Sequence, residues 1–169
     1  AFAELTGALG DQVFEVELPP IFENAADQRE LINLAEMARH YFTYHRDGAD
    51  RLGAETREGI ERGNAILARD YLAALDWPTV LAAALDEIFD RCDAILCPAA
   101  TGPAPKSLDH TGSAIFNGLW TLCGLPAVTL PLLTSSGGLP MGVQLVAGRG
   151  NDARLLRSAR WLFHWAATS

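Results

Sequence analysis

The sequence predicts an α/β fold in which a mixed β-sheet is flanked by helices. Two observations support this prediction: apolar residues recur at helical spacing across residues 31–89, and three short β-like runs follow Asp93. The chain has 169 residues, of which 49% are hydrophobic and 20% charged, as in ordinary globular domains. We expect a single domain over residues 1–169. Within it, residues 1–92 form a mainly helical half and residues 93–169 a strand-loop-helix half that completes the sheet.

The opening segment, AFAELTGALGDQVFEVELPP, predicts the end of a helix, a stop at Gly10 and a strand from Val13 to Leu18. Apolar residues alternate with glutamates in that strand, the period of a half-buried strand. A helix that leads directly into a strand is typical of the second half of a βαβ unit. We therefore expect the chain to be a fragment of a longer protein.

Three helices are predicted next, because apolar residues recur every three to four positions. Their apolar stripes run from Leu31 to His45, from Ile60 to Leu75 and from Leu81 to Phe89. Pro78 falls in the first turn of the third helix, where proline is tolerated.

The second half alternates strands with helices. DAILCPA and, later, LPAVTLPLL and MGVQLVAG read as strands, and ATGPAPKSLDH reads as a loop. A short helix is predicted from about Thr111, as N-cap, to Cys123, with Gly124 as its stop. Asn151 or Asp152 caps a final helix.

Two adjacent serines, Ser135 and Ser136, lie within TSSGGLP between the last two strands. A serine nucleophile needs a base within hydrogen-bond reach and an oxyanion site. The sequence places neither Lys106 nor His110 beside this pair. Gly137 and Gly138 can supply the positive φ of a tight turn, so we predict a hairpin tip.

Composition excludes several classes of function. The net charge is −8, with one lysine and no basic stripe, so we expect no direct nucleic-acid binding. No apolar run is long enough to span a bilayer, and there is no basic-then-apolar leader, so we expect a cytoplasmic protein without a membrane partner. The three cysteines lack metal-ligand spacing, and we expect reduced thiols, no metal and no cofactor.

Three segments of the second half carry a family resemblance. They are DAILCPAATGPAP, TGSAIFNGLWTLCGLPAVTLPLL and GLPMGVQLVAGRGNDARLL, in this order and spacing. The chain resembles the C-terminal portion of amidase signature family enzymes, and VFEVELP and ARDYLAA extend the resemblance more weakly into the first half. The resemblance implies a C-terminal part of the amidase signature fold and hydrolysis of the carbon–nitrogen bond of a small amide.

The resemblance also implies a Ser–Ser–Lys triad in a Gly/Ser-rich segment, and nothing in this chain matches that segment. We therefore expect no catalytic residue here and an inactive isolated chain. The family implies that the stretch before the GxP strand helps to wall an acyl pocket. The matching candidates for substrate binding are Phe116, Asn117, Trp120 and Thr121. An aromatic pair four residues apart is equally compatible with simple core packing.

Two alternative functions stay open. One is a fragment of the A subunit of a glutamyl-tRNA(Gln) amidotransferase. The absence of any acidic residue from Ser113 to Trp120 argues against glutamine as substrate. The other is a non-catalytic interaction module. In either case we expect the exposed sheet edge to drive self-association or pairing with the missing N-terminal half. In the full-length protein the expected partner is a small-molecule amide substrate.

Overall fold

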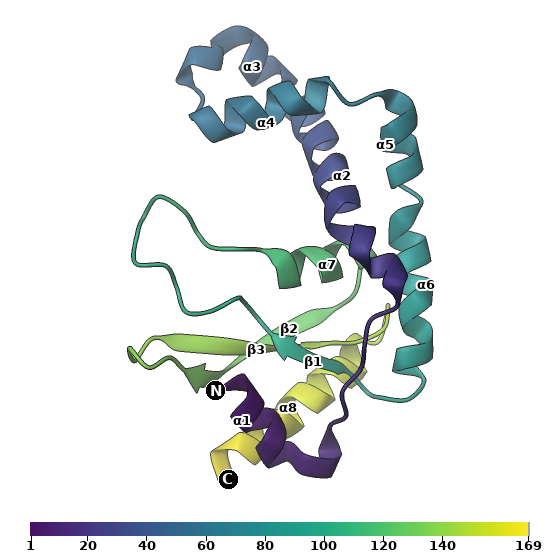
Figure 1. The fold of residues 1–169 in the computed structure, drawn as a ribbon, viewed down its shortest axis with the longest axis vertical. Coiled ribbons are helices and arrows are strands. Elements are labelled where there is room, and N and C mark those ends of the chain that lie inside the picture. Colours follow the sequence, from purple (N-terminus) through teal and green to yellow (C-terminus); the bar gives the residue numbers. More distant parts are fainter. Residues whose placement is uncertain (169) are drawn as a thin grey trace.

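The computed structural model describes residues 1–168, which fold into a small sheet with helices on both faces (Figure 1). The α-helices are α1 (Phe2–Leu9), α2 (Ala25–His40), α3 (Phe42–Gly48), α4 (Ala54–Asn64), α5 (Ala68–Ala74), α6 (Trp77–Phe89), α7 (Ile115–Cys123) and α8 (Asp152–Thr168). Short 3₁₀ turns occupy η1 (Gly10–Gln12), η2 (Pro20–Asn24) and η3 (Ala49–Arg51). The strands are β1 (Ile95–Pro98), β2 (Ala127–Thr134) and β3 (Pro140–Val146). The predicted α/β architecture is confirmed.

The described strands form one sheet in the order β1-β3-β2, with antiparallel pairing throughout. Ile95 lies opposite Val146 on one side of β3, and Ala127 lies opposite the same residue on the other side. The last strand in the chain is therefore the centre of the sheet.

Each face of β3 contributes to a separate hydrophobic core. Val146 packs with Leu81, Leu85 and Trp120, which come from α6 and α7. The second core joins Val143, Leu145 and Ala147 to side chains of α1 and α8. The alternation of these residues along β3 follows from the two-residue period of a strand.

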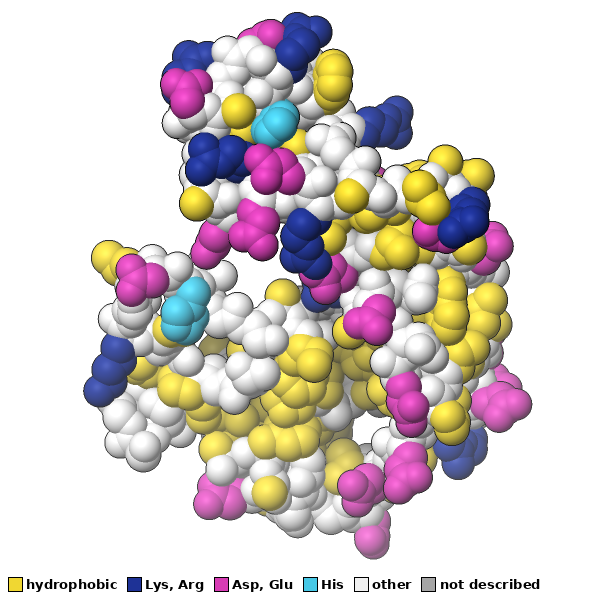
Figure 2. Space-filling model, turned by 45° about the horizontal axis from the view of Figure 1, so that its top comes forward, with side chains coloured by type: hydrophobic (Ala, Val, Ile, Leu, Met, Phe, Trp, Pro, Cys, Tyr) yellow, Lys and Arg dark blue, Asp and Glu magenta, His cyan; other side chains and the backbone are white. Residues whose placement is uncertain are grey.

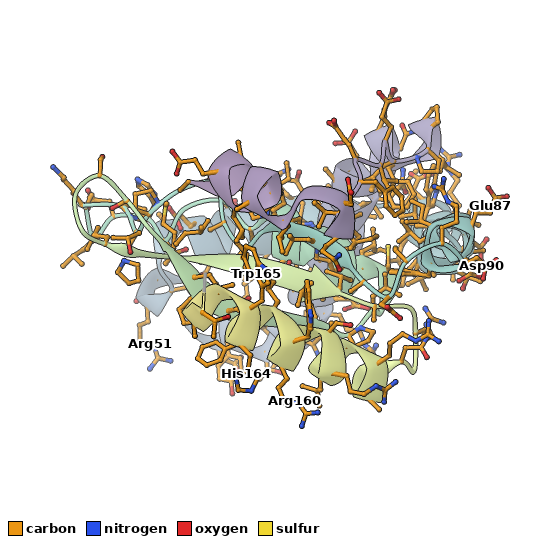
Figure 3. The ribbon with its side chains drawn as sticks, turned by 90° about the horizontal axis from the view of Figure 1, so that it is seen from below. Arg51, Glu87, Asp90, Arg160, His164 and Trp165 are labelled. Atoms are coloured by element: carbon orange, nitrogen blue, oxygen red, sulfur yellow. The ribbon has the colours of Figure 1, made fainter. Side chains whose placement is uncertain are left out.

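Helix α8 covers the sheet face opposite to α7. Figure 3 shows Trp165 on the side of α8 that faces the sheet, whereas Arg160 and His164 point away from it. Among residues 1–168, no helix combines the length and the apolar character needed to cross a bilayer.

Helices α2 to α6 form an upright arm beside the sheet (Figure 1). Helices α2 and α6 stand next to α7, and α3 and α4 lie at the far end of the arm. Residues 99–114 form a long loop on the opposite side of α7.

Two of the three predicted helices of the first half are wrong in their continuity. The stripe from Leu31 to His45 is divided at Tyr41, where α2 ends and α3 begins. The stripe from Ile60 to Leu75 is divided at Leu67, which adopts an extended conformation (φ −74°, ψ 142°). The predicted helix around Leu81 is confirmed as α6, with Pro78 in its first turn.

The predicted strand from Val13 to Leu18 is also wrong. Val13 is extended (φ −132°, ψ 150°), but residues 13–18 pair with no described strand. The alternating side chains are used for packing instead, because Val13 contacts the core under α8 and Val16 contacts the core under α7. A β-strand requires backbone hydrogen bonds to a neighbouring strand, and the local sequence does not show whether such a neighbour exists.

The start of α7 differs from the prediction, whereas its end is confirmed. Gly112 has φ +90°, and helical structure begins only at Ile115, so Thr111 is not the N-cap. Gly124 adopts the left-handed conformation (φ 64°, ψ 36°) and ends the helix, as predicted.

The serine pair forms the predicted hairpin between β2 and β3. Two backbone hydrogen bonds of Ser135 close the turn. Its N–H donates to the Leu139 carbonyl at 2.8 Å, and its carbonyl accepts from the Gly138 N–H at 2.9 Å. The Ser135 hydroxyl accepts a bond from the Leu139 N–H at 3.0 Å. Gly138 has φ +81°, and Gly137 does not share this conformation.

Candidate functional site

A cavity of about 650 Å³ opens on one face of α7. Its walls come from residues 16–18, η2, the start of α2, β1 and α7. In Figure 2 hydrophobic side chains gather in the hollowed centre of this face, and charged side chains lie around it. The apolar members of the lining are Val16, Leu18, Phe22, Ala25, Ala26, Ile95, Leu96, Cys97, Ile115, Phe116, Leu119 and Trp120. A concave, mainly apolar site with few polar groups is typical of small-molecule binding.

The structure divides the four predicted substrate-binding residues into two pairs. Phe116 and Trp120 both line the cavity, as their four-residue spacing on one helix face requires. Asn117 and Thr121 are exposed and are not part of its lining. The participation of all four residues in substrate binding remains a prediction.

Asn117 has a defined position that ties α7 to the sheet. Its Oδ1 accepts a hydrogen bond from Gln144 Nε2 at 2.6 Å, and its Nδ2 donates to the Ala99 carbonyl at 3.4 Å. Gln144 is a buried polar residue of β3, with only 4% of its surface exposed. A buried amide needs such a partner. Asn117 therefore fixes the position of α7 relative to β3 and to the residue that follows β1.

Trp120 lines the cavity, and its indole nitrogen is a buried donor. Only 4% of this residue is exposed, and within residues 1–168 its Nε1 has no hydrogen-bond partner. Burial raises the pKa of the neighbouring Cys97 thiol, and the Trp120 indole opposes that shift only in part. The Cys97 Sγ instead donates to Gln144 Oε1 at 3.8 Å. The indole N–H is therefore enclosed by protein atoms beside the Cys97 sulfur and is not exposed in the cavity.

Two charged residues of the cavity were not found from the sequence. Glu23 lies in η2 and Arg29 in α2, about 90 residues before Phe116 in the chain, yet both line the same space. Arg29 forms no ion pair and no hydrogen bond with any residue in the described part of the chain. In the sequence these two residues belong to an acid-rich helical region, and nothing local distinguishes them from a solvated face.

In the described structure no hydrogen bond joins a serine hydroxyl to a lysine or histidine side chain, and the serine hydroxyl that donates to a carboxylate is Ser107, which bonds to Asp109 in the exposed loop. The only lysine, Lys106, is exposed in the long loop, and no hydrogen bond joins it to a serine hydroxyl in the described structure. Ser135 is used in the hairpin tip. The same residues contain no group of three His, Cys, Asp or Glu side chains that could hold a metal ion.

A family model described as Amidase matches residues 8–156. The chain belongs to the amidase family. The match covers both halves of the structure, including the cavity and all three strands.

Curated relatives in this family are named as the A subunit of glutamyl-tRNA(Gln) amidotransferase. The protein of that name from Neisseria meningitidis serogroup A / serotype 4A is 35% identical over 127 residues, which cover 69% of this chain and 26% of the relative. Its counterpart from Neisseria meningitidis serogroup B is 31% identical over 185 residues, covering 92% of this chain and 38% of the relative. The chain therefore spans about a quarter to two fifths of the length of these relatives.

Solved structures of the family share the fold. A crystal structure described as an amidase superposes with a TM-score of 0.85 at 23% identity, covering 96% of this chain and 41% of that one. A 6-aminohexanoate cyclic dimer hydrolase, solved with its substrate, gives a TM-score of 0.75 at 23% identity, covering 98% of this chain and 40% of that one. These likenesses show the fold of the described residues and place it within a larger family fold.

Proposed function

We propose that this chain is the sheet-completing part of an amide hydrolase and walls the cavity that holds the acyl group of a small amide. The observation that supports this function most strongly is the position of Phe116 and Trp120. In a chain of the amidase family, both aromatic side chains line one apolar cavity of about 650 Å³. Apolar burial of an acyl group against these two side chains would hold the substrate.

We propose that the groups that break the amide bond lie in the part of the longer family members that this chain does not span. Enzymes must lower the barriers of their reactions by ~8–23 kcal/mol, which takes an activated nucleophile and oriented donors at the developing oxyanion. We expect the isolated chain to release no product from a chromogenic anilide of hexanoic acid beyond the rate in buffer. A catalytically complete amidase serves as the positive control. Turnover by this chain alone would contradict the proposed location of the catalytic groups.

The proposed contribution of this chain to the cavity wall must be tested in a complete enzyme. Trp120→Ala, transferred to the matching position of a full-length relative, should lower kcat/KM about tenfold or more for long acyl groups and little for acetyl, because a removed apolar contact costs ~1–3 kcal/mol. Leu156→Ala is the matched control, because Leu156 is an exposed apolar residue of α8 outside the cavity lining. An equal decrease in kcat/KM for all acyl sizes would show that Trp120 only stabilises the hydrophobic core.

A second candidate function is that of a glutamyl-tRNA(Gln) amidotransferase A subunit, the name carried by the curated relatives. The segment from Ser113 to Trp120 has no acidic residue for a glutamine ammonium. The structure nevertheless brings Glu23 into the cavity from η2. Calorimetric titration with glutamine and with hexanamide separates the candidates: binding of glutamine alone would favour the amidotransferase.

The proposed partner is the remaining part of the family fold, docked along the sheet. Within residues 1–168, β1 and β2 each leave one edge without a strand partner. Such edges pair readily with other chains. We expect the isolated chain to self-associate, so that its mass by light scattering rises with concentration. A monomer at every concentration would instead favour a self-sufficient interaction module.

A further inference from the structure

A second cavity, of about 580 Å³, lies on the α8 side of the sheet. Its floor consists of apolar side chains of the second hydrophobic core, namely Leu9, Val13, Leu96, Leu145 and Leu162. Its walls come from η1 and the two residues after it, from the turn between α6 and β1, and from α8. Among the described residues, only Leu96 lines this cavity as well as the one at α7. The volume is typical of small-molecule sites.

The lining of this cavity has a positive excess, although the net charge of the chain is −8. The charged members are three arginines, Arg91, Arg154 and Arg157, and two aspartates, Asp11 and Asp93. Arg154 Nη1 lies 3.7 Å from Asp93 Oδ1. Arg91 Cζ lies 5.7 Å from the centre of the Phe14 ring. Arg157 forms no ion pair or hydrogen bond with any residue of the described chain.

Arg157 shares one side of α8 with an exposed aromatic ring. Four residues of this helix line the cavity at spacings of three or four: Arg154, Arg157, Ser158 and Trp161. Helical side chains lean toward the N-terminus, so the Trp161 ring is directed toward the turn that carries Arg157. Trp161 precedes by four residues Trp165, which Figure 3 shows on the sheet side of α8. The stripe therefore runs along the border between the buried face of α8 and solvent.

We propose that this cavity binds an aromatic monocarboxylate, with the carboxylate at Arg157 and the ring between Trp161 and the apolar floor. Arg154 is paired with Asp93, so Arg157 is the arginine of this stripe that has donors to spare. A guanidinium is a planar fork that matches the two oxygens of a carboxylate. Trp161 is 47% exposed, and a ring placed against it would bury apolar surface of both. This site does not depend on the proposed amide hydrolysis.

Asp11 is the group that opposes this assignment. It lines the same cavity and forms no ion pair within the described chain. Asp11 belongs to η1, however, whereas Arg157 belongs to α8 and has Arg154 one turn before it on the same stripe. The lining has three arginines against two aspartates, and this excess of one positive charge favours a monoanion over a cation.

The experiment follows the indole N–H signals of the ¹⁵N-labelled chain during titration with 2-naphthoate, 2-naphthamide and 2-naphthylmethylammonium. We expect 2-naphthoate to shift the Trp161 signal and to bind about fivefold more tightly than 2-naphthamide, a modest ratio because Arg157 is exposed to solvent. The ammonium compound should bind most weakly. Trp161→Phe assigns the signal. In the same spectra, Trp120 reports on the cavity at α7, which it lines.

Three variants change one charge each at exposed positions, so all three should fold. Arg157→Gln should bring 2-naphthoate to within about twofold of 2-naphthamide. Asp11→Asn should strengthen the binding of 2-naphthoate about twofold and leave that of 2-naphthamide unchanged. Arg160→Gln is the matched control, because it removes the same charge from α8 at a position that points away from the sheet (Figure 3). It should leave the preference for 2-naphthoate unchanged.

Equal binding of 2-naphthoate and 2-naphthamide by the unaltered chain would overturn the carboxylate assignment, as would tighter binding of the ammonium compound. Absence of any shift at Trp161 would overturn the site itself. A shift at Trp120 alone would place the ligand in the cavity at α7, against this inference but without harm to the proposed function. Loss of the preference in Arg160→Gln would show that it reflects net charge alone.

Discussion

Replacement of Gly63 by alanine tests the closest approach between two helices of the arm. Gly63 is buried in α4 against α2, and a Cβ there would be 2.7 Å from the carbonyl carbon of Leu34 and 2.8 Å from Ala38 Cβ. Backbone atoms cannot move aside without displacing the helix. Overpacking of this kind costs ~1–3 kcal/mol, and the gain in helix propensity returns at most ~1 kcal/mol. The net cost is therefore ~0–2 kcal/mol, and because backbone atoms are in the way we expect Gly63→Ala to lower the free energy of unfolding by about 2 kcal/mol, the upper end.

Gly59 provides a matched control one turn earlier in α4. Its Cβ would meet the flexible end of Met37, with Cε at 2.6 Å and Sδ at 3.2 Å. Met37 can change rotamer, so Gly59→Ala should be close to neutral. Thermal unfolding followed by circular dichroism should show Tm lowered by about 4–8 °C for Gly63→Ala and by less than about 2 °C for Gly59→Ala. Equal Tm values for both variants would refute the close α2–α4 packing.

The remaining predictions concern a buried amide and a buried thiol. Asn117→Ala should lower the free energy of unfolding by about 1–3 kcal/mol, because the buried Gln144 amide loses its acceptor, whereas Thr121→Ala should stay within ~0.5 kcal/mol. Equal denaturant midpoints would contradict that role of Asn117. Burial raises the pKa of the Cys123 thiol to about 11, against a weaker opposite effect of Arg149. The unfolded chain ionises this thiol at a lower pH, so the free energy of unfolding should fall by about 2 kcal/mol between pH ~9 and ~11. Cys123→Ala should remove that slope, and a slope unchanged in this variant would assign it to other groups.

Elements defined by neighbouring residues were predictable from the sequence. The hairpin at Ser135 lies between two strands that pair directly with each other, so one local turn determines their relationship. The stop at Gly124 and the position of Pro78 also depend on the backbone preferences of single residues.

The spacing of apolar residues gave a wrong helix prediction where those residues are exposed in the structure. Leu67 and Leu72 were placed on one buried stripe, yet 51% and 62% of their surfaces are accessible. Between α4 and α5, residues 65–67 contain no glycine or proline, and the nearby Gly63 lies within α4. Sequence spacing detects an apolar face but does not show whether another element covers it.

The candidate site was predictable only in part for a similar reason. Phe116 and Trp120 share α7, so their spacing placed them on one wall. Arg29 comes to the cavity from α2 and rests on α7 at Gly118, which leaves room for it, and this contact depends on the packing of two helices that are far apart in the sequence. No local pattern connects the two positions.

The central place of β3 has a consequence during synthesis. Ile95 in β1 pairs with Val146, so the backbone groups of β1 have no ladder partner until β3 has been made. At ~5–20 residues per second, a ribosome needs several seconds to cover that interval. Throughout this delay β1 remains open to pairing with other nascent chains, and the interval is the period in which a chaperone would protect this protein most effectively.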